Sequence, residues 1–204
     1  MVQLLDSNHR DQLATWIGGR PRHFRLLYKI SRDGCSNGAF HQQCDGQGPT
    51  VTVLYNTKNT IYGGYLSESW NSDDDNIDDP SAFLFRLQYN GSYNPLKFPV
   101  KDSTYAGYGG GDKGPTFGEE HAPDFQTFTE TVTKLGNYFS LNGNFNKIGN
   151  TYNLNGQNIS SITNNSLQVT DLEVYKVEGI LLDVKHKLTK IHIKVNLSYL
   201  YSSP

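Results

Sequence analysis

The strongest constraint on the fold is an alternating, β-branched segment, Thr50 to Tyr55 (Thr-Val-Thr-Val-Leu-Tyr). Such residues favour extended strands, because branched and aromatic side chains pack well on a pleated surface. Residues 56–59 predict a turn, and Thr60 to Tyr65 predicts the returning strand of a hairpin. The Gly63-Gly64 pair inside that strand indicates a bulge or a close approach of another backbone. The chain is therefore expected to fold around a β-sheet.

Further segments show strand patterns that are separated by turn-forming residues. The run from Ser81 to Leu87 follows Asp79-Pro80 and predicts a strand that continues to Tyr89. The other predicted strands are 24–31, a short edge at 97–100, 125–133 and 167–177. Strands that alternate with turns predict a mainly β, α+β fold with layers packed on a common core.

Short helices and polar loops connect these strands. Residues 7–17 predict an amphipathic helix that ends at Gly18-Gly19. A second short helix follows Ser36 as its N-cap, with Phe40 and Cys44 facing inward. The predicted loops are an acidic loop at 71–79 and a Gly-rich loop at 102–123. The Asn- and Gly-rich region at 137–165 is expected to contain loops and short strands.

The length of 204 residues fits one large domain with an appendage. We expect a domain over residues 1–177 and a helix–strand extension over residues 178–204. Residues 180–188 have helical spacing, and apolar residues alternate from Ile191 to Tyr201. We expect the segment 191–201 to pair with the sheet or to be buried against a partner, because an exposed apolar edge promotes aggregation.

Composition excludes several classes of protein. The formal net charge of −2 argues against a dedicated nucleic-acid-binding protein. Two cysteines, Cys35 and Cys44, are too few for a disulfide-rich secreted scaffold. The sequence has no apolar window long enough for a membrane span, and residues 1–6 do not form a signal peptide. A cytoplasmic protein is therefore expected.

Two loops have compositions that suggest ligands. The stretch Gly109 to Gly114 formally matches a dinucleotide-binding pattern, but Pro115 and Thr116 follow it where a helix N-terminus is required. Calcium would suit the acidic run from Asp73 to Asp79, although this run lacks the glycine and terminal glutamate of an EF-hand. We interpret both segments as solvated loops, and calcium or nucleotide binding remains an alternative.

Two groups of side chains are candidates for acid–base or thiol chemistry. Glu119, Glu120 and His121, with Asp124 nearby, combine carboxylates with an imidazole. His41 precedes Cys44 by three positions and would permit a thiol–imidazole pair. We favour a structural or surface role for both groups, because titratable neighbours are common and catalytic ones are rare.

Basic residues gather in the N-terminal part of the chain. Such a patch would suit an acidic protein surface, although scattered solvated side chains have the same composition. The residues are Arg20, Arg22, Arg25, Lys29 and Arg32.

An ordered series of motifs resembles the TLDc family. The series starts with Leu26 to Gly34 and continues through 39–53 and Ile61 to Tyr65. It then runs through 81–87, 97–100, 114–118 and 172–177. The resemblance covers residues 24–177 together with the leading helix, and is strongest to the N-terminal part of the interferon-induced protein 44 group. Members of that group carry a GTPase-like domain after the TLDc domain. These residues contain no P-loop, so we expect no GTP binding.

The resemblance implies a β-sandwich of two antiparallel sheets that is flanked by short helices. It also implies roles in protection against oxidative stress and, for several members, binding to the vacuolar proton-pumping ATPase (V-ATPase). It supplies no established catalytic residues and no cofactor. Our first hypothesis is a non-catalytic interaction domain in stress or innate antiviral physiology. The alternative is a redox-reactive or hydrolytic enzyme that uses Cys35, Cys44 or the His121 region. The oligomeric state stays open.

Overall fold

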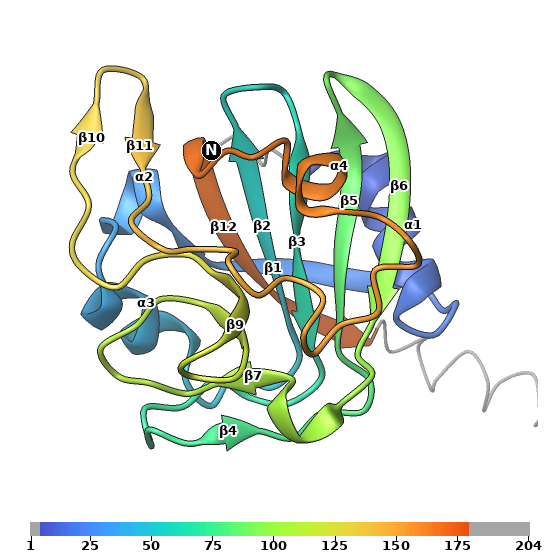
Figure 1. The fold of residues 1–204 in the computed structure, drawn as a ribbon, viewed down its shortest axis with the longest axis horizontal. Helices are drawn as coiled ribbons and strands as arrows, with labels where there is room; N and C mark the ends of the chain where they lie inside the picture. The colour runs from blue at the N-terminus through green and yellow to red at the C-terminus, as the bar shows by residue number, and fades with distance from the viewer. Residues whose placement is uncertain (1–4, 180–204) are drawn as a thin grey trace, which may run out of the picture.

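An eight-stranded antiparallel sheet dominates the protein, which we describe from a computed structural model over residues 5–179. The order β10-β11-β12-β2-β3-β5-β6 is visible in Figure 1, and β1 pairs with β12 outside this path. The strands of this sheet are β1 (Arg22–Lys29), β2 (Thr50–Asn56), β3 (Ile61–Leu66), β5 (Phe83–Tyr89), β6 (Ser92–Pro99), β10 (Lys134–Leu135), β11 (Tyr138–Ser140) and β12 (Gln168–Gly179).

Two small sheets lie over one face of the large sheet. One joins β4 (Asn76–Ile77) to β7 (Gly107–Tyr108), and the other joins β8 (Thr116–Gly118) to β9 (Pro123–Gln126). The predicted mainly β, α+β fold is confirmed. The two-layer arrangement that the resemblance implies takes the form of one large sheet and two two-stranded sheets.

The hairpin that the sequence predicts most strongly forms the centre of the large sheet. The side chain of Asn56 closes its turn, because Oδ1 accepts hydrogen bonds from the N–H groups of Lys58 (3.0 Å) and Thr60 (2.9 Å). A Cβ added to Gly63 would lie 1.8 Å from the carbonyl oxygen of Thr52. The close backbone approach that the glycine pair predicts is therefore confirmed.

The centre of the large sheet is buried on both faces, so β2 and β3 have no exposed side. On one face, Phe24 of β1 packs with Val51 and Phe83 in a cluster that α1 (Ser7–Trp16) covers. On the other face, Phe117 and Phe125 of the small sheet pack into a larger cluster. Apolar burial on two faces supplies most of the stabilisation of such a layered fold.

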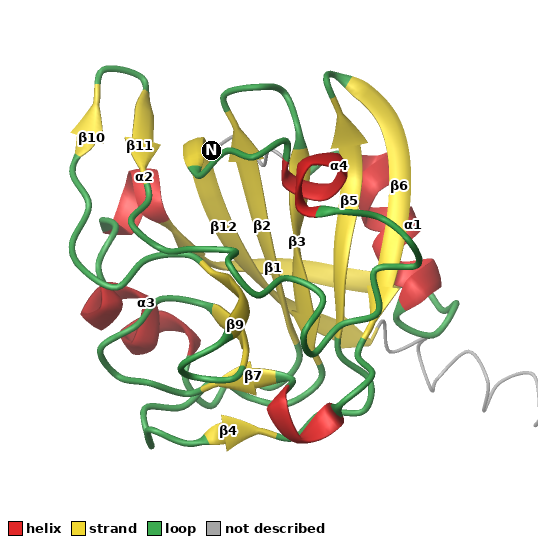
Figure 2. Ribbon diagram, in the orientation of Figure 1, coloured by secondary structure: helices red, strands yellow, loops and turns green. Residues whose placement is uncertain are grey.

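The helices flank the large sheet (Figure 2). They are α1, α2 (Ile30–Asp33), α3 (Asn37–Cys44) and α4 (Ile159–Thr163). Ser36 caps α3 by accepting a hydrogen bond from the N–H of Ala39 at 3.3 Å, as the sequence predicts. Phe40 and Cys44 are buried beneath this helix, so its predicted inward face is confirmed.

Some predicted boundaries were wrong. The short edge at 97–100 belongs to the longer strand β6, because Asn90 and Gly91 both adopt positive φ and close a tight hairpin with β5. The strand predicted over 24–31 ends at Lys29, where α2 begins. The strand predicted over 125–133 is only β9, which ends at Gln126, because Pro115 accepts a hydrogen bond from the N–H of Thr127 but has no N–H to return one.

The predicted helix at 180–188, the predicted strand at 191–201 and nearly all of the predicted extension lie outside the described residues. Within residues 5–179, no helix is long and apolar enough to cross a membrane.

Candidate functional site

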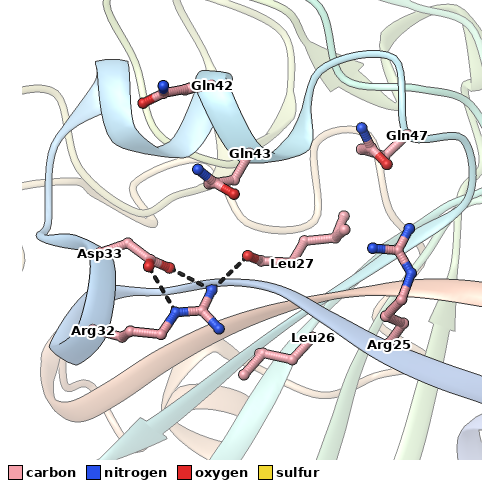
Figure 3. A pocket seen from close by; sticks show the side chains of 8 residues that line it. All are labelled: Arg25, Leu26, Leu27, Arg32, Asp33, Gln42, Gln43 and Gln47. Carbon is pink, nitrogen blue, oxygen red and sulfur yellow. Dashed lines mark hydrogen bonds and ion pairs between the residues drawn. The ribbon is translucent and has the colours of Figure 1, made fainter.

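A polar groove separates β1 from α3 and is the candidate site (Figure 3). Backbone and side chains of β1 and α2 form one wall, and α3 with the segment after it forms the other. The lining residues are Arg25, Leu26, Leu27, Arg32, Asp33, Gln42, Gln43 and Gln47. The fold places these residues together because α3 packs through Phe40 against Tyr28 of β1, with ring centroids 5.8 Å apart.

One end of the groove is closed by the ion pair of Arg32 and Asp33. The guanidinium donates to both carboxylate oxygens, at 2.6 and 2.7 Å, and to the carbonyl of Leu27 at 2.6 Å. Burial alone raises the pKa of Asp33, but hydrogen bonds from Arg32 and from the N–H of Lys29 outweigh it and hold that pKa below its usual value. This end of the groove is therefore rigid and ionised at neutral pH.

Beside the groove, cations outnumber carboxylates. Arg25 of β1 lies directly opposite Lys176 of β12, and His23 lies opposite Glu178. Glu178 contacts Arg25 Nε and His23 Nδ1, each at 3.2 Å. Hydrogen bonds with His23 and Arg25, followed by the nearby charges of Arg25 and Lys176, lower the pKa of Glu178. One carboxylate thus faces two cations, Arg25 and Lys176, on this side of the strands.

The opposite wall of the groove carries three glutamines. Gln42 and Gln43 belong to the exposed side of α3, and Gln47 follows the helix. Figure 3 shows Gln43 between α3 and β1, with Gln47 facing the end of Arg25. Each amide group offers both hydrogen-bond donors and an acceptor, so this wall suits a polar ligand such as a peptide backbone.

The structure separates the predicted pair of His41 and Cys44. His41 Nδ1 lies 2.8 Å from a carboxylate oxygen of Asp45, and Nε2 faces the carbonyls of Gly110 and Lys113 at 3.0 and 2.9 Å. His41 therefore fastens the Gly-rich loop to α3. Cys44 is fully buried, and burial raises the pKa of its thiol.

Cys35 is also buried, and burial raises the pKa of its thiol to about 12. A reactive cysteine requires an accessible thiol with a lowered pKa. Neither cysteine meets this requirement in the folded protein.

The residues from Glu119 to Asp124 do not converge on one point. Asp124 is buried and accepts hydrogen bonds from the N–H groups of Gly149 (2.6 Å), Thr151 (2.8 Å) and Tyr152 (3.3 Å). Burial raises the pKa of Asp124, although these hydrogen bonds oppose the shift. Asp124 therefore anchors the segment 149–152.

The neighbours of Asp124 face solvent. His121 is at the surface, with 84% of its side chain exposed. Glu120 contacts Lys113 at 3.4 Å, and Glu119 is half-buried. The structure gives these residues no shared site with Asp124.

The acidic and Gly-rich loops bind each other. The N–H of Asp74 donates to the carbonyl of Gly109, and the N–H of Gly109 donates to the carbonyl of Asp75, both at 2.9 Å. Asp79 is buried and accepts a hydrogen bond from the hydroxyl of Ser67 at 2.6 Å. Among residues 5–179, no group of three or more histidine, cysteine or acidic side chains is arranged to hold a metal ion.

Only part of the predicted basic patch lies at the surface of the protein. Lys29 is buried and ion-paired with Glu173 and Asp171, so its assignment to the patch was wrong. The burial of these two carboxylates is not evident from the sequence, because polar residues such as Gln168 and Thr170 also alternate with apolar ones along β12. The sequence did not identify Lys176 or the glutamines of the groove as functional residues, because no sequence motif shows that α3 and β12 lie near each other.

Comparison with known proteins places the fold in a family. A sequence model of the TLDc domain matches residues 2–178. The chain belongs to the TLDc domain family. The match includes both walls of the groove and the whole of the large sheet apart from Gly179, the last residue of β12.

Named relatives are similar over shorter stretches. Interferon-induced protein 44 of Homo sapiens is 40% identical over 62 residues, which is 30% of this chain and 13% of that protein. The protein of the same name in Pan troglodytes is 39% identical over 62 residues, with the same coverage. MTOR-associated protein MEAK7 of Danio rerio is 32% identical over 69 residues, which is 34% of this chain and 15% of that protein. These alignments span no more than 15% of the relatives' length.

Proposed function

We propose that this TLDc domain is a non-catalytic protein-interaction module, and that the groove between β1 and α3 is part of its contact surface. The observation that carries the proposal is a polar groove, built on ordered strands and a helix, whose basic and amide groups face solvent. The candidate catalytic groups support the same view. Asp124, Cys35 and Cys44 are buried, and His41 holds the Gly-rich loop.

The finer assignment rests on the family. We propose a cytoplasmic protein that acts in oxidative-stress protection or innate antiviral responses, with the V-ATPase as candidate partner. Similarity to interferon-induced protein 44 favours the antiviral setting. Similarity to MTOR-associated protein MEAK7 favours assembly with a larger complex. We also propose that residues 178–204 form an extension of the domain, since the family match ends at residue 178.

A pull-down with purified V-ATPase tests the proposed partner. The full chain is immobilised, the pump is captured, and ATP hydrolysis is measured with and without the free chain. We expect capture at micromolar protein and a change in the hydrolysis rate. Failure to capture the pump at micromolar concentration would overturn this partner and leave the interaction module to be tested with others.

A further inference from the structure

We infer that the groove between β1 and α3 receives an extended acidic segment of a partner protein. The inference deepens the proposed function, on which it rests, by specifying the chemistry of the partner. Three features of the groove carry it: the outer edge of β1, the cations around Arg25, and the glutamines of the opposite wall.

The outer edge of β1 presents main-chain groups to the groove. Within the described part of the chain, β12 is the strand that pairs with β1, and α3 lies on the other side. Side chains satisfy part of this edge: the carbonyl of Leu27 accepts from Arg32 at 2.6 Å, and the N–H of Lys29 donates to Asp33 at 2.9 Å. These contacts show that main-chain groups of β1 point away from β12 on this side, and Arg32 and Asp33 already occupy the part near α2. An extended segment would therefore align along the rest of this edge, beside Leu26 and Arg25.

The charges next to this edge are complementary to a carboxylate. Arg25 and Lys176 occupy directly opposite positions on β1 and β12, and like charges so placed repel each other. Glu178 only partly balances them, because a single carboxylate faces these two cations. The Arg25 side chain is 47% exposed, so a partner carboxylate has access to it. An acidic side chain between Arg25 and Lys176 would relieve the repulsion and form charge-assisted hydrogen bonds.

The glutamines define the form of the ligand. Gln42, Gln43 and Gln47 follow the α3 wall along the groove. Amide side chains recognise the alternating N–H and C=O groups of an extended main chain without selecting particular side chains. The ion pair of Arg32 and Asp33 is self-satisfied and closes one end. We therefore assign the preference for acidic side chains to Arg25 and Lys176. The preference for an extended main chain is assigned to the glutamines.

The test is an NMR titration of the full chain with three synthetic peptides of equal length, in which serine alternates with glutamate, glutamine or lysine. We expect the glutamate peptide to shift the backbone signals of Arg25, Gln43 and Lys176. We expect binding to weaken when salt is raised, because exposed charges are screened. Arg25→Glu and Lys176→Glu should each weaken binding about fivefold, the effect of about 1 kcal/mol at an exposed ion pair.

Lys147→Glu is the matched control, because Lys147 is an exposed lysine outside the groove. It should bind the glutamate peptide as the unaltered chain does. Thermal unfolding of every variant separates lost binding from lost folding. Arg25→Gln, which removes the charge without placing a second carboxylate beside Glu178, provides a milder test of the same contact.

Several outcomes would overturn the inference. These are unchanged groove signals at millimolar glutamate peptide, equal binding of the glutamine or lysine peptide, or stronger binding of a short single-stranded RNA to the same residues. The inference and the proposed partner fail separately. If Arg25→Glu still captures the V-ATPase as well as the unaltered chain does, the pump contact lies elsewhere. If the pump is not captured but the glutamate peptide binds, the inference of an acidic ligand is supported, and that ligand belongs to a partner other than the V-ATPase.

Discussion

The ammonium nitrogen of Lys29 lies 2.7 Å from Oε1 of Glu173, and both side chains are buried where β1 pairs with β12. Oε2 of the same carboxylate accepts hydrogen bonds from the hydroxyls of Tyr55, at 2.8 Å, and Tyr175. Asp171 adds a second carboxylate oxygen 3.2 Å from the ammonium. This network joins three neighbouring strands, β1, β12 and β2, behind the wall of the groove.

Lys29→Met is expected to lower the free energy of unfolding by about 3–5 kcal/mol, because it leaves Glu173 buried without its counter-charge. The double variant Lys29→Met/Glu173→Gln should lose less, since it removes both charges and keeps an acceptor oxygen for the tyrosines. Urea unfolding measures both values. A loss below about 1 kcal/mol for Lys29→Met would show that the pair is not buried as described.

Asp33→Asn tests the charge that closes the groove. The pKa of Asp33 is lower in the folded chain than its usual value, so its carboxylate contributes stability above about pH 4. That contribution is lost as the pH falls through the lowered pKa of the folded state. The difference in Tm between the unaltered chain and Asp33→Asn should therefore be largest near neutral pH and shrink below about pH 4. A pH-independent difference in thermal unfolding would contradict this account.

Gly63→Ala and Gly38→Ala add the same methyl group in opposite surroundings. A Cβ at Gly63 would lie 1.8 Å from the carbonyl oxygen of Thr52, whereas nothing lies within 4 Å of one at Gly38 in α3. We expect Gly63→Ala to destabilise by at least about 1–3 kcal/mol through overpacking. Gly38→Ala should stabilise by about 0.5–1 kcal/mol through helix propensity. Urea unfolding compares them, and equal effects would refute the close backbone approach.

The parts of the fold that follow local rules were predictable from the sequence. The alternating, β-branched residues predict the β2–β3 hairpin, and Ser36 as N-cap predicts where α3 begins. The Asn90-Gly91 turn carries an equally local signal. The helix α4 lies in a region expected to contain loops and short strands, although Asn158 caps it. Both features depend on turn and cap chemistry that short sequence motifs do encode.

The groove was not predictable, because it depends on contacts between distant segments. Arg25 and Lys176 are far apart in the chain and become neighbours only through the register of β1 with β12. The burial of Lys29 depends in the same way on its distant partner Glu173. Lysine side chains are mostly exposed, so a lysine within a basic stretch is expected at the surface from the sequence alone. The loops show the same limit, because the hydrogen bonds between the acidic and Gly-rich segments join positions that are far apart in the chain.

The thiols give the prediction that discriminates most directly between an interaction module and a peroxide-reactive protein. Cys35 and Cys44 are buried, and burial raises the pKa of both thiols. Because the thiolate is the reactive form, we expect neither cysteine to react with iodoacetamide or peroxide in the folded chain. Mass spectrometry before and after unfolding in urea measures this, and both thiols should be labelled only in urea. Cys35→Ser/Cys44→Ser should leave any peroxide protection unchanged. A thiol that is labelled in the folded chain as fast as free cysteine would revive the redox alternative.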